Sequence, residues 1–324
     1  MQETGGYLYK HINTLVLSKW VLVALRMIRD CKKQVGSLSL LKVLILVLSL
    51  LGLSAHGALW TITYPRPIDD TDERTQYPIA LLKLALDKTG VNYELLPSDR
   101  ILLTGKAMRQ LRENREVSVV WSMTDIQREK DLTAIRIPIA KGLIGLRVFA
   151  IQDQKSAKFA QVESIADMRE LVPIQGEDWP DTKILQASGF NVFTVPEFDK
   201  AYDFLSQGKG DFFPRSVIEI TPELDKLGKS ASVSLEPSLA IYYPTAMYYF
   251  VSNNNKTLAH LIETGLQRAI EDGSFDTLFQ STYMPILDEI NMDERTIFTI
   301  ENPLLPNDTP LSNEALWYKT AAEK

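Results

Sequence analysis

Residues 197–213, EFDKAYDFLSQGKGDFF, place an amphipathic segment directly before a short strand-like run and decide how the rest of the chain is interpreted. Apolar residues recur in the first part at the i, i+3, i+4, i+7 spacing of a helix with one face on a core: Phe198, Ala201, Tyr202 and Leu205. The turn Gly208-Lys209-Gly210 leads from this helix into the run 210–213. A helix that leads by a tight turn into a buried strand is part of a β-α-β unit, so the neighbouring segments are expected to supply the other strands.

The neighbouring segments alternate between strand and helix patterns. Upstream, the sequence predicts two strands, at 171–175 and 191–195, and two helices, at 164–170 and 180–187. An earlier unit of the same kind has three predicted strands, at 59–64, 91–96 and 117–121, and two helices, at 77–89 and 105–113. Each unit is followed by a long β stretch, at 135–151 and at 239–252, and the chain then closes with helices at 255–271 and 274–283.

Two β-α-β units joined by two long β stretches predict an α/β, bilobed fold in which the chain crosses near 146–151 and returns near 241–250. One continuous doubly wound domain is the alternative, but single cores rarely grow beyond about 250–300 residues, which favours two lobes. The proline-rich tail 301–318 is expected either to pack across the first lobe through Leu316 and Trp317 or to hang free. We expect an N-terminal extension with signal peptide (1–57) and a first lobe (58–145). A second lobe follows (146–240), and the chain then returns to the first lobe with the closing helices and the tail (241–324).

The N-terminal part has the pattern of a secretory signal peptide. An apolar run from Val43 to Leu53 follows Lys42 and precedes the small-residue site Ala55-His56-Gly57. An uncleaved membrane anchor is the alternative, but the run is shorter than the roughly 20 residues that a spanning helix needs. The sequence therefore predicts export and a periplasmic location.

Composition excludes several functional classes. Residues 1–57 hold seven of the 35 Lys/Arg, two of the 41 Asp/Glu, and the only cysteine, Cys31, which leaves 28 basic against 39 acidic residues and a net charge of −11 for 58–324. Such an acidic chain is a poor partner for nucleic acid, because phosphate contacts need clustered positive charge. Only His260 remains of three histidines, so Ser-His, Cys-His and zinc sites are disfavoured. No phosphate-binding or dinucleotide motif is present, and we expect neither an enzyme nor a cofactor nor a metal.

Candidate binding residues of the first lobe follow its predicted strands. In open α/β sheets ligands bind at the carboxyl ends of the strands. A capping box formed by Thr124 and Gln127 is predicted to begin a helical turn, which with Arg128 makes an anion site. A solvated helix face is the alternative for Arg128, because acidic residues surround it. The candidates of this lobe are Tyr64, Arg66, Trp121, Ser122, Thr124 and Arg128.

The second lobe offers Trp179, Phe213 and Arg215 at the corresponding strand ends. Pro214 and Arg215 are expected where the chain leaves the sheet, so the guanidinium would face the space between the lobes and grip a carboxylate bidentately. A buried structural ion pair, for example with Glu219, is an equally good interpretation of Arg215.

Four motifs in the same order resemble the periplasmic solute-binding proteins of the polar-amino-acid type, also known as bacterial extracellular solute-binding protein family 3. They are YPRP (64–67), SMTDIQR (122–128), LSQGKGDFF (205–213) and AIEDGSFDTLFQSTY (269–283). The resemblance covers almost all of 58–324 and implies a bilobed type II fold that closes on a small solute and delivers it to an ABC-type permease. In that family the arginine of the second motif holds the ligand carboxylate, a role that would fall on Arg128. A sensory module of the same fold, acting on a membrane receptor, is the alternative function.

Two departures from the family bear on the ligand. Thr124 stands four residues before Arg128, where the family usually has three. Family members that bind α-amino acids usually place an aspartate about five residues after the strand's own aspartate; counted from Asp211 this position is Ser216, beside Arg215. A cation there repels an ammonium group by about 1–4 kcal/mol at roughly 4 Å. We therefore expect an anionic solute, such as a carboxylate, an acidic amino acid or a peptide-like ligand, bound by a monomer.

Overall fold

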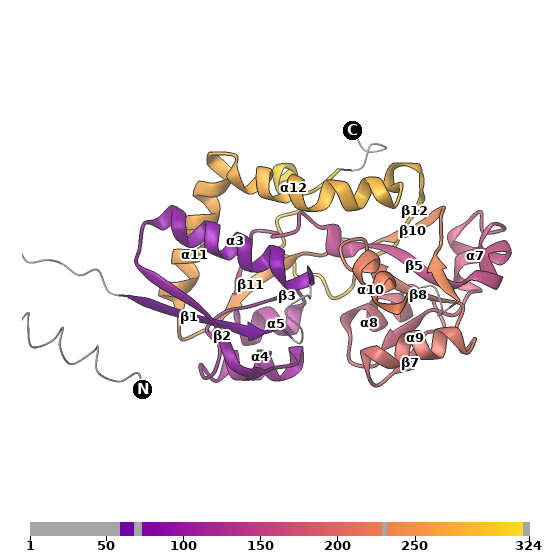
Figure 1. Cartoon of the computed structure of the whole chain (residues 1–324), viewed down its shortest axis with the longest axis horizontal. Coiled ribbons are helices and arrows are strands. Elements are labelled where there is room, and N and C mark those ends of the chain that lie inside the picture. Colours follow the sequence, from indigo (N-terminus) through magenta and orange to yellow (C-terminus); the bar gives the residue numbers. More distant parts are fainter. Residues whose placement is uncertain (1–58, 68–72, 229–231, 320–324) are drawn as a thin grey trace, which may run out of the picture. The chain divides into compact units, whose positions relative to one another are not determined.

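The structure is a computed structural model that describes residues 59–67, 73–228 and 232–319 (Figure 1). Ala58–Lys324 forms one compact unit. The predicted signal peptide and Cys31 lie outside the described residues. In the ranges that are described, no helix is both long and apolar enough to cross a membrane.

Two small sheets with their helices make up what we call the first half. Strands β1 (Trp60–Arg66) and β2 (Tyr93–Ile101) pair in parallel, as expected for two strands joined by a helix, here α3 (Glu73–Thr89). In the second sheet, the returning strand β11 (Met247–Val251) pairs antiparallel with two flanking strands, β3 (Val120–Met123) and β4 (Thr133–Ile135). The remaining helices of this half are α4 (Thr104–Arg112), α5 (Ile126–Asp131), α11 (Lys256–Glu271) and α12 (Ser274–Glu289).

The second half contains a sheet in the order β12-β10-β5-β8, with β9 also on β5, and the parallel pair β6-β7. Its strands are β5 (Leu146–Gln152), β6 (Ile174–Gly176), β7 (Phe193–Val195), β8 (Phe212–Ser216), β9 (Val233–Leu235), β10 (Leu239–Tyr242) and β12 (Thr296–Thr299). Its helices are α6 (Ser156–Phe159), α7 (Ile165–Arg169), α8 (Pro180–Ala187), α9 (Phe198–Ser206) and α10 (Ile220–Leu227). The predicted α/β fold with two β-α-β parts and two crossings is confirmed.

The two long β stretches are interrupted at the crossings, contrary to the prediction. The outgoing stretch breaks between β4 and β5, where Lys141 and Gly142 adopt left-handed φ angles of 45° and 82° before a 3-10 turn at Leu143–Gly145. The returning stretch breaks between β10 and β11, where Pro244 lacks an N–H group for strand pairing. Each crossing is therefore a short irregular segment between two strands rather than one continuous strand.

Strand β8 runs further than predicted. Pro214 and Arg215 stay in the sheet opposite Phe149 and Val148 of β5 instead of leaving it. On its outer side β8 has, among the described residues, only an isolated bridge, between Phe212 and Pro173, and no continuous ladder. A proline at position 214 is tolerated there, because no strand partner on that side needs its N–H group. The side chain of Arg215 is consequently held by the sheet and is 5% exposed.

The described part of the C-terminal tail packs against the outgoing crossing segment, so it does not hang free. The Trp317 indole covers Gly142, where an added Cβ would lie 2.6 Å from the ring. Lys141 donates from Nζ to the carbonyl of Ala315 at 3.1 Å, and its own carbonyl accepts from the Tyr318 amide at 2.8 Å.

Helices α3 and α11 pack with their backbones in close approach (Figure 1). A Cβ added at Gly265 of α11 would lie 2.0 Å from the carbonyl oxygen of Ala85 in α3. Leu82 and Leu86 of α3 are fully buried beside this contact, with Leu266 of α11. Glycine at 265 therefore sets the distance between the two helices.

We expect Gly265→Ala to destabilise the protein by about 3 kcal/mol or more, because the methyl group meets backbone that cannot move aside. The matched control is Gly105→Ala in α4, where an added Cβ meets nothing within 4 Å and should stabilise the helix slightly. Denaturant unfolding of both variants measures the difference. Equal stability of the two variants would contradict the close helix approach.

Candidate functional site

Tyr64 of β1 and Trp121 of β3 lie side by side in the first half. Their ring centroids are 6.1 Å apart and the ring planes tilt by 39°. Arg66, two residues along β1, donates from Nε to the Ser98 carbonyl at 2.7 Å, and no acidic side chain of the described residues pairs with it. Ser122 follows Trp121 on β3 and is half-buried. Of these side chains the structure brings Tyr64 and Trp121 into contact, whereas Ser122, the next residue of the strand after Trp121, points to the opposite face of β3.

The helical turn after β3 begins one residue later than predicted. Asp125 is the N-cap of α5, and its Oδ1 accepts a hydrogen bond from the Arg128 amide at 2.8 Å. Thr124 still belongs to the strand side, because its amide donates to the Ala246 carbonyl at 2.8 Å. The predicted capping box of Thr124 and Gln127 is therefore wrong. An aspartate one position later caps this turn instead.

The Arg128 guanidinium turns back onto its own half. Its Nη1 donates to the Met123 carbonyl, and it lies 3.5 Å from the Asp125 carboxylate. Burial lowers the pKa of Arg128, and Asp125 offsets this effect only in part. The Thr124 hydroxyl donates to Glu129 at 2.6 Å. Both predicted ligand contacts of this turn are thus engaged within the protein, and their role toward a solute stays a prediction.

Trp179, Phe213 and Arg215 come together in the second half. The Arg215 Cζ lies 5.3 Å from the centroid of the Trp179 ring, 5.2 Å from that of Phe213 and 5.2 Å from that of Phe198. The indole lies over Gly176, where an added Cβ would come within 2.4 Å of it. The guanidinium is thus enclosed by aromatic faces, which attract a cation.

Two glutamates of the segment after β8 complete the surroundings of Arg215. Glu223 accepts bidentately, from Nε at 2.8 Å and from Nη2 at 2.7 Å, and Glu219 lies 3.2 Å from Nη2. The Tyr202 hydroxyl also donates to Glu223, at 2.9 Å. Burial opposes the charge of Arg215, but the two carboxylates outweigh it and hold its pKa well above the ordinary value. The geometry is that of a buried ion pair, and a grip of Arg215 on a solute stays a prediction.

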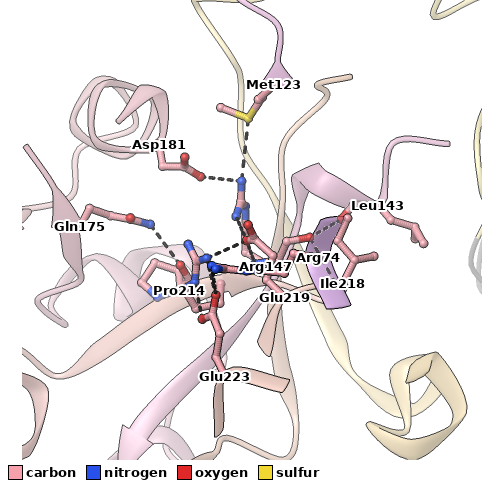
Figure 2. Close-up of polar contacts among 12 residues, drawn as sticks. Arg74, Met123, Leu143, Arg147, Gln175, Asp181, Pro214, Ile218, Glu219 and Glu223 are labelled. Atoms are coloured by element: carbon pink, nitrogen blue, oxygen red, sulfur yellow. Dashed lines mark hydrogen bonds and ion pairs between the residues drawn. The ribbon is translucent and has the colours of Figure 1, made fainter. Parts of the chain in front are cut away.

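A second arginine, Arg147 of β5, lies beside Glu219 (Figure 2). It forms ion pairs with Asp181 at 2.7 Å and with Glu219 at 3.3 Å, and its Cζ lies 5.4 Å from the centroid of the Tyr243 ring. The Tyr243 hydroxyl donates to Asp181. From the first half, the Met123 sulfur accepts from Nη2 at 3.8 Å. Arg147 therefore connects β5, α8 and the end of β3.

Arg74 of α3 adds a further link from the first half. Its Nη1 lies 3.4 Å from Glu223, and its Cζ lies 5.6 Å from the centroid of the Phe198 ring. We use the name charge cluster for the six side chains joined in this way, namely Arg74, Arg147, Asp181, Arg215, Glu219 and Glu223.

The charge cluster is formally neutral, with three guanidinium groups and three carboxylates. Burial alone would raise the pKa of Glu219, but Arg215, Arg147 and Arg74 outweigh this effect and lower it. Burial likewise opposes the charge of Arg147, yet Asp181 and its other partners leave its pKa raised. The shifts of Glu219 and Arg147 thus favour their charged forms, and the formal charges of the six side chains sum to zero.

Two buried polar atoms next to the cluster have no hydrogen-bond partner among the described residues. They are Nε of Arg147, which is a donor, and Oε1 of Gln175, which is an acceptor. The amide nitrogen of Gln175 is engaged, since it donates to the Pro214 carbonyl at 3.1 Å (Figure 2). A buried polar atom without a partner is costly, and both atoms therefore retain unused hydrogen-bonding capacity.

Sequence reasoning missed most of the charge cluster. Arg147 carried a usable signal, because it is the one charged residue in the apolar run 143–151 and a charge inside a buried strand needs a partner. Glu223 stands four residues after Glu219, on the same side of a helical turn, which also could have been noticed. Arg74 and Asp181 carried no such signal, since only the tertiary fold brings them to their partners.

Solved structures share this fold with the chain. An ancestral arginine-binding protein bound to arginine aligns with 69% of this chain and 98% of its own length, at 16% identity and a TM-score of 0.50. The periplasmic VFT2 domain of BvgS from Bordetella pertussis aligns with 69% of this chain and 93% of its own, at 13% identity and a TM-score of 0.51. An arginine-specific periplasmic binding protein from Salmonella typhimurium aligns with 69% and 99%, at 12% identity and a TM-score of 0.50.

These likenesses concern the fold. The arrangement of elements is that of the bilobed periplasmic binding proteins, as the motifs predicted. No known family profile matches the chain, and no curated protein sequence does.

We expect Arg215→Ala to destabilise the protein by about 3–5 kcal/mol, because it leaves Glu219 and Glu223 buried without their main counter-charge. Lys88→Ala is the control, since it breaks the exposed pair with Asp272 and should leave the free energy of unfolding close to that of the parent. Urea unfolding of the two variants makes the comparison. A parent-like Arg215→Ala would show that the ion pair contributes little.

The lowered pKa of Glu219 predicts a pH dependence of stability. A carboxyl group whose pKa is lower in the folded state stabilises the fold above its unfolded pKa, about 4.3, and this contribution disappears as the pH falls through the folded pKa. Between pH 6 and pH 3 the free energy of unfolding should therefore decrease more steeply with falling pH for the parent than for Glu219→Gln. Glu94→Gln, an exposed residue of β2, is the matched control, and a Glu219→Gln slope equal to that of the parent would contradict the assignment.

Proposed function

We propose that this chain is a periplasmic solute-binding protein that captures a small polar, anionic solute between its two halves and delivers it to an ABC-type permease. The observation that carries the proposal is the unpartnered buried Nε of Arg147, because the guanidinium of this arginine also contacts Met123 of the first half. Gln175 Oε1, whose amide nitrogen bonds to Pro214 of β8, is a second unpartnered atom of the second half. Closure of two halves around a solute is the motion that such a bilobed arrangement supports.

The aromatic and polar side chains have separate roles in this proposal. Tyr64 and Trp121 provide the apolar surface on which the solute rests, and the role of the Ser122 hydroxyl toward the solute stays a prediction. Trp179, which is half-buried, provides the opposite wall, and Phe213, which is fully buried, packs behind it. Both rings are held against Arg215 and have little freedom to move.

The preference for an anion rests on Arg66. Arg215 and Arg128 both have carboxylate partners within the protein, and the charge cluster as a whole is neutral. Arg66 has no carboxylate partner among the described residues, so it keeps a full positive charge for a ligand. A guanidinium binds a carboxylate bidentately, which fits a carboxylate, an acidic amino acid or a peptide-like solute.

One observation favours a second candidate function, a sensory module read by a membrane receptor. The ion pair of Arg74 with Glu223 joins the halves through the protein's own groups. A protein whose halves are joined without a solute can report on a change of conformation rather than carry a solute. Proteins that transport would retain a tracer solute and release it to the permease, whereas a sensor needs only the partner that reads its conformation.

The test is a thermal-shift screen of the full chain with amino acids, di- and tricarboxylates, short peptides and phosphorylated metabolites. A solute at about 1,000 times its dissociation constant adds about 4 kcal/mol, which raises the melting temperature by roughly 8–16 °C in a protein of this size. We expect the largest shift with a carboxylate. A larger shift with a neutral or cationic amino acid would contradict the anionic preference, and the absence of a shift with every compound would contradict solute binding.

Arg66→Met separates binding from stability. We expect this variant to weaken binding of the anionic solute about tenfold or more, because a charge-assisted hydrogen bond is lost, while the melting temperature of the unliganded protein stays close to that of the parent. Titration calorimetry gives the affinity. Arg109→Met is the matched control on an exposed helix face and should bind as the parent does. Unchanged affinity in Arg66→Met would remove this arginine from the site.

A further inference from the structure

A strongly basic surface lies on the outer side of α4, in an otherwise acidic chain. Residues 100–115, RILLTGKAMRQLRENR, contain five Arg/Lys and one acidic residue, whereas residues 58–324 carry a net charge of −11. Two large aliphatic side chains within this segment are exposed, Ile101 at 48% and Leu103 at 67%. We use the name basic-apolar surface for Arg100, Ile101, Leu103, Lys106, Arg109, Arg112 and Arg115.

The cations of α4 share one face of the helix. Lys106, Arg109 and Arg112 are spaced three residues apart, opposite the face that is buried through Ala107 and Leu111. Three cations of the surface are paired at exposed positions: Arg112 lies 3.4 Å from Asp131, Arg115 lies 3.2 Å from Glu113, and Arg100 binds Glu116. Neither Lys106 nor Arg109 forms an ion pair with any described residue, so their charges are available to a partner.

The start of α4 departs from the usual rules of helix stability. Its N-cap is Leu103, which offers no side-chain hydrogen bond to the free amides, although Ser, Thr, Asp and Asn are strongly preferred there. The first turn has no acidic residue and contains Lys106, which the helix dipole disfavours. Leu103 and Lys106 thus both destabilise the start of an exposed helix, and such residues are expected where the surface has a binding function.

We propose that the basic-apolar surface docks onto an anionic phospholipid bilayer. Ile101 and Leu103 bury their side chains at the boundary of headgroups and acyl chains, and the cations of α4 contact lipid phosphates. The rest of the chain is acidic and is repelled by the same bilayer, so docking takes place with α4 toward the lipid.

The size of the surface favours lipid over a protein partner. A stable protein interface buries about 800 Å² on each side and has an apolar centre. Here the exposed apolar part consists of two neighbouring side chains surrounded by cations, which is too small for such a centre. A bilayer needs only a few inserted side chains when cations contribute beside them.

The experiment measures hydrogen exchange of the full chain with vesicles of phosphatidylglycerol and phosphatidylcholine, and with vesicles of phosphatidylcholine alone. We expect amides of residues 100–115 to become protected with the anionic vesicles only. Because the readout is local, lipid binding by any other part of the chain does not produce it. The double variant Lys106→Glu, Arg109→Glu should weaken this protection about tenfold or more in vesicle titrations, and Leu103→Ser should weaken it without changing net charge.

The matched control is the double variant Lys83→Glu, Lys183→Glu, which makes the same charge change at exposed positions of α3 and α8 and should keep the protection. Circular dichroism establishes that every variant is folded. Equal protection by neutral vesicles, equal protection in the α4 and control variants, or no protection at all would overturn the proposal. Protection by polyglutamate but not by anionic vesicles would overturn it in favour of an acidic protein partner.

Discussion

Two guanidinium groups are buried where β5 pairs with β8, and this constraint organises the surrounding structure. Arg147 lies opposite Ser216, and Arg215 lies opposite Val148, so the two cations occupy adjacent positions of one strand pair. A buried charge is tolerated only with a matched partner, and two like charges in close proximity need several. The helices α8, α10 and α3 each bring one or more members of the charge cluster, so electrostatic matching as well as apolar packing determines where these helices lie.

The same constraint separates structural arginines from those available for binding. The sequence allowed a ligand contact or a buried ion pair for Arg215, and its hydrogen-bonding capacity is directed at Glu219 and Glu223. The sequence provided no reason to separate Arg66 from the other two predicted site arginines, Arg128 and Arg215. In the structure, Arg66 is the one of the three whose charge no described carboxylate balances. A count of arginines near strand ends therefore overestimates the attraction for an anion, and the pairing of each arginine decides its contribution.

Local signals in the sequence predicted local structure well. The apolar spacing of α9, the capping box of Ser164 and Asp167, and the proline at the start of α8 all correspond to helices in the structure. One local signal failed, since Asp125 and not Thr124 caps the turn after β3. The other failures arose where the outcome depended on a partner far away in sequence. Pro214 remains in its strand because β8 lies at a sheet edge, and Arg74 reaches Glu223 only after the halves are assembled. Neither fact is encoded within a short window of residues.

The last described residues serve both halves of the protein. Strand β12 pairs with β10 in the second half, while Trp317 covers Gly142 on the segment that leads from the first half to the second. Contacts that join chain segments so distant from one another form late and slowly, because a large loop must close before they are made. Neither half can be completed from a contiguous stretch of the growing polypeptide. The protein therefore acquires its final form only after its C-terminal residues have been synthesised, and until then its crossing segments and sheet edge remain uncovered.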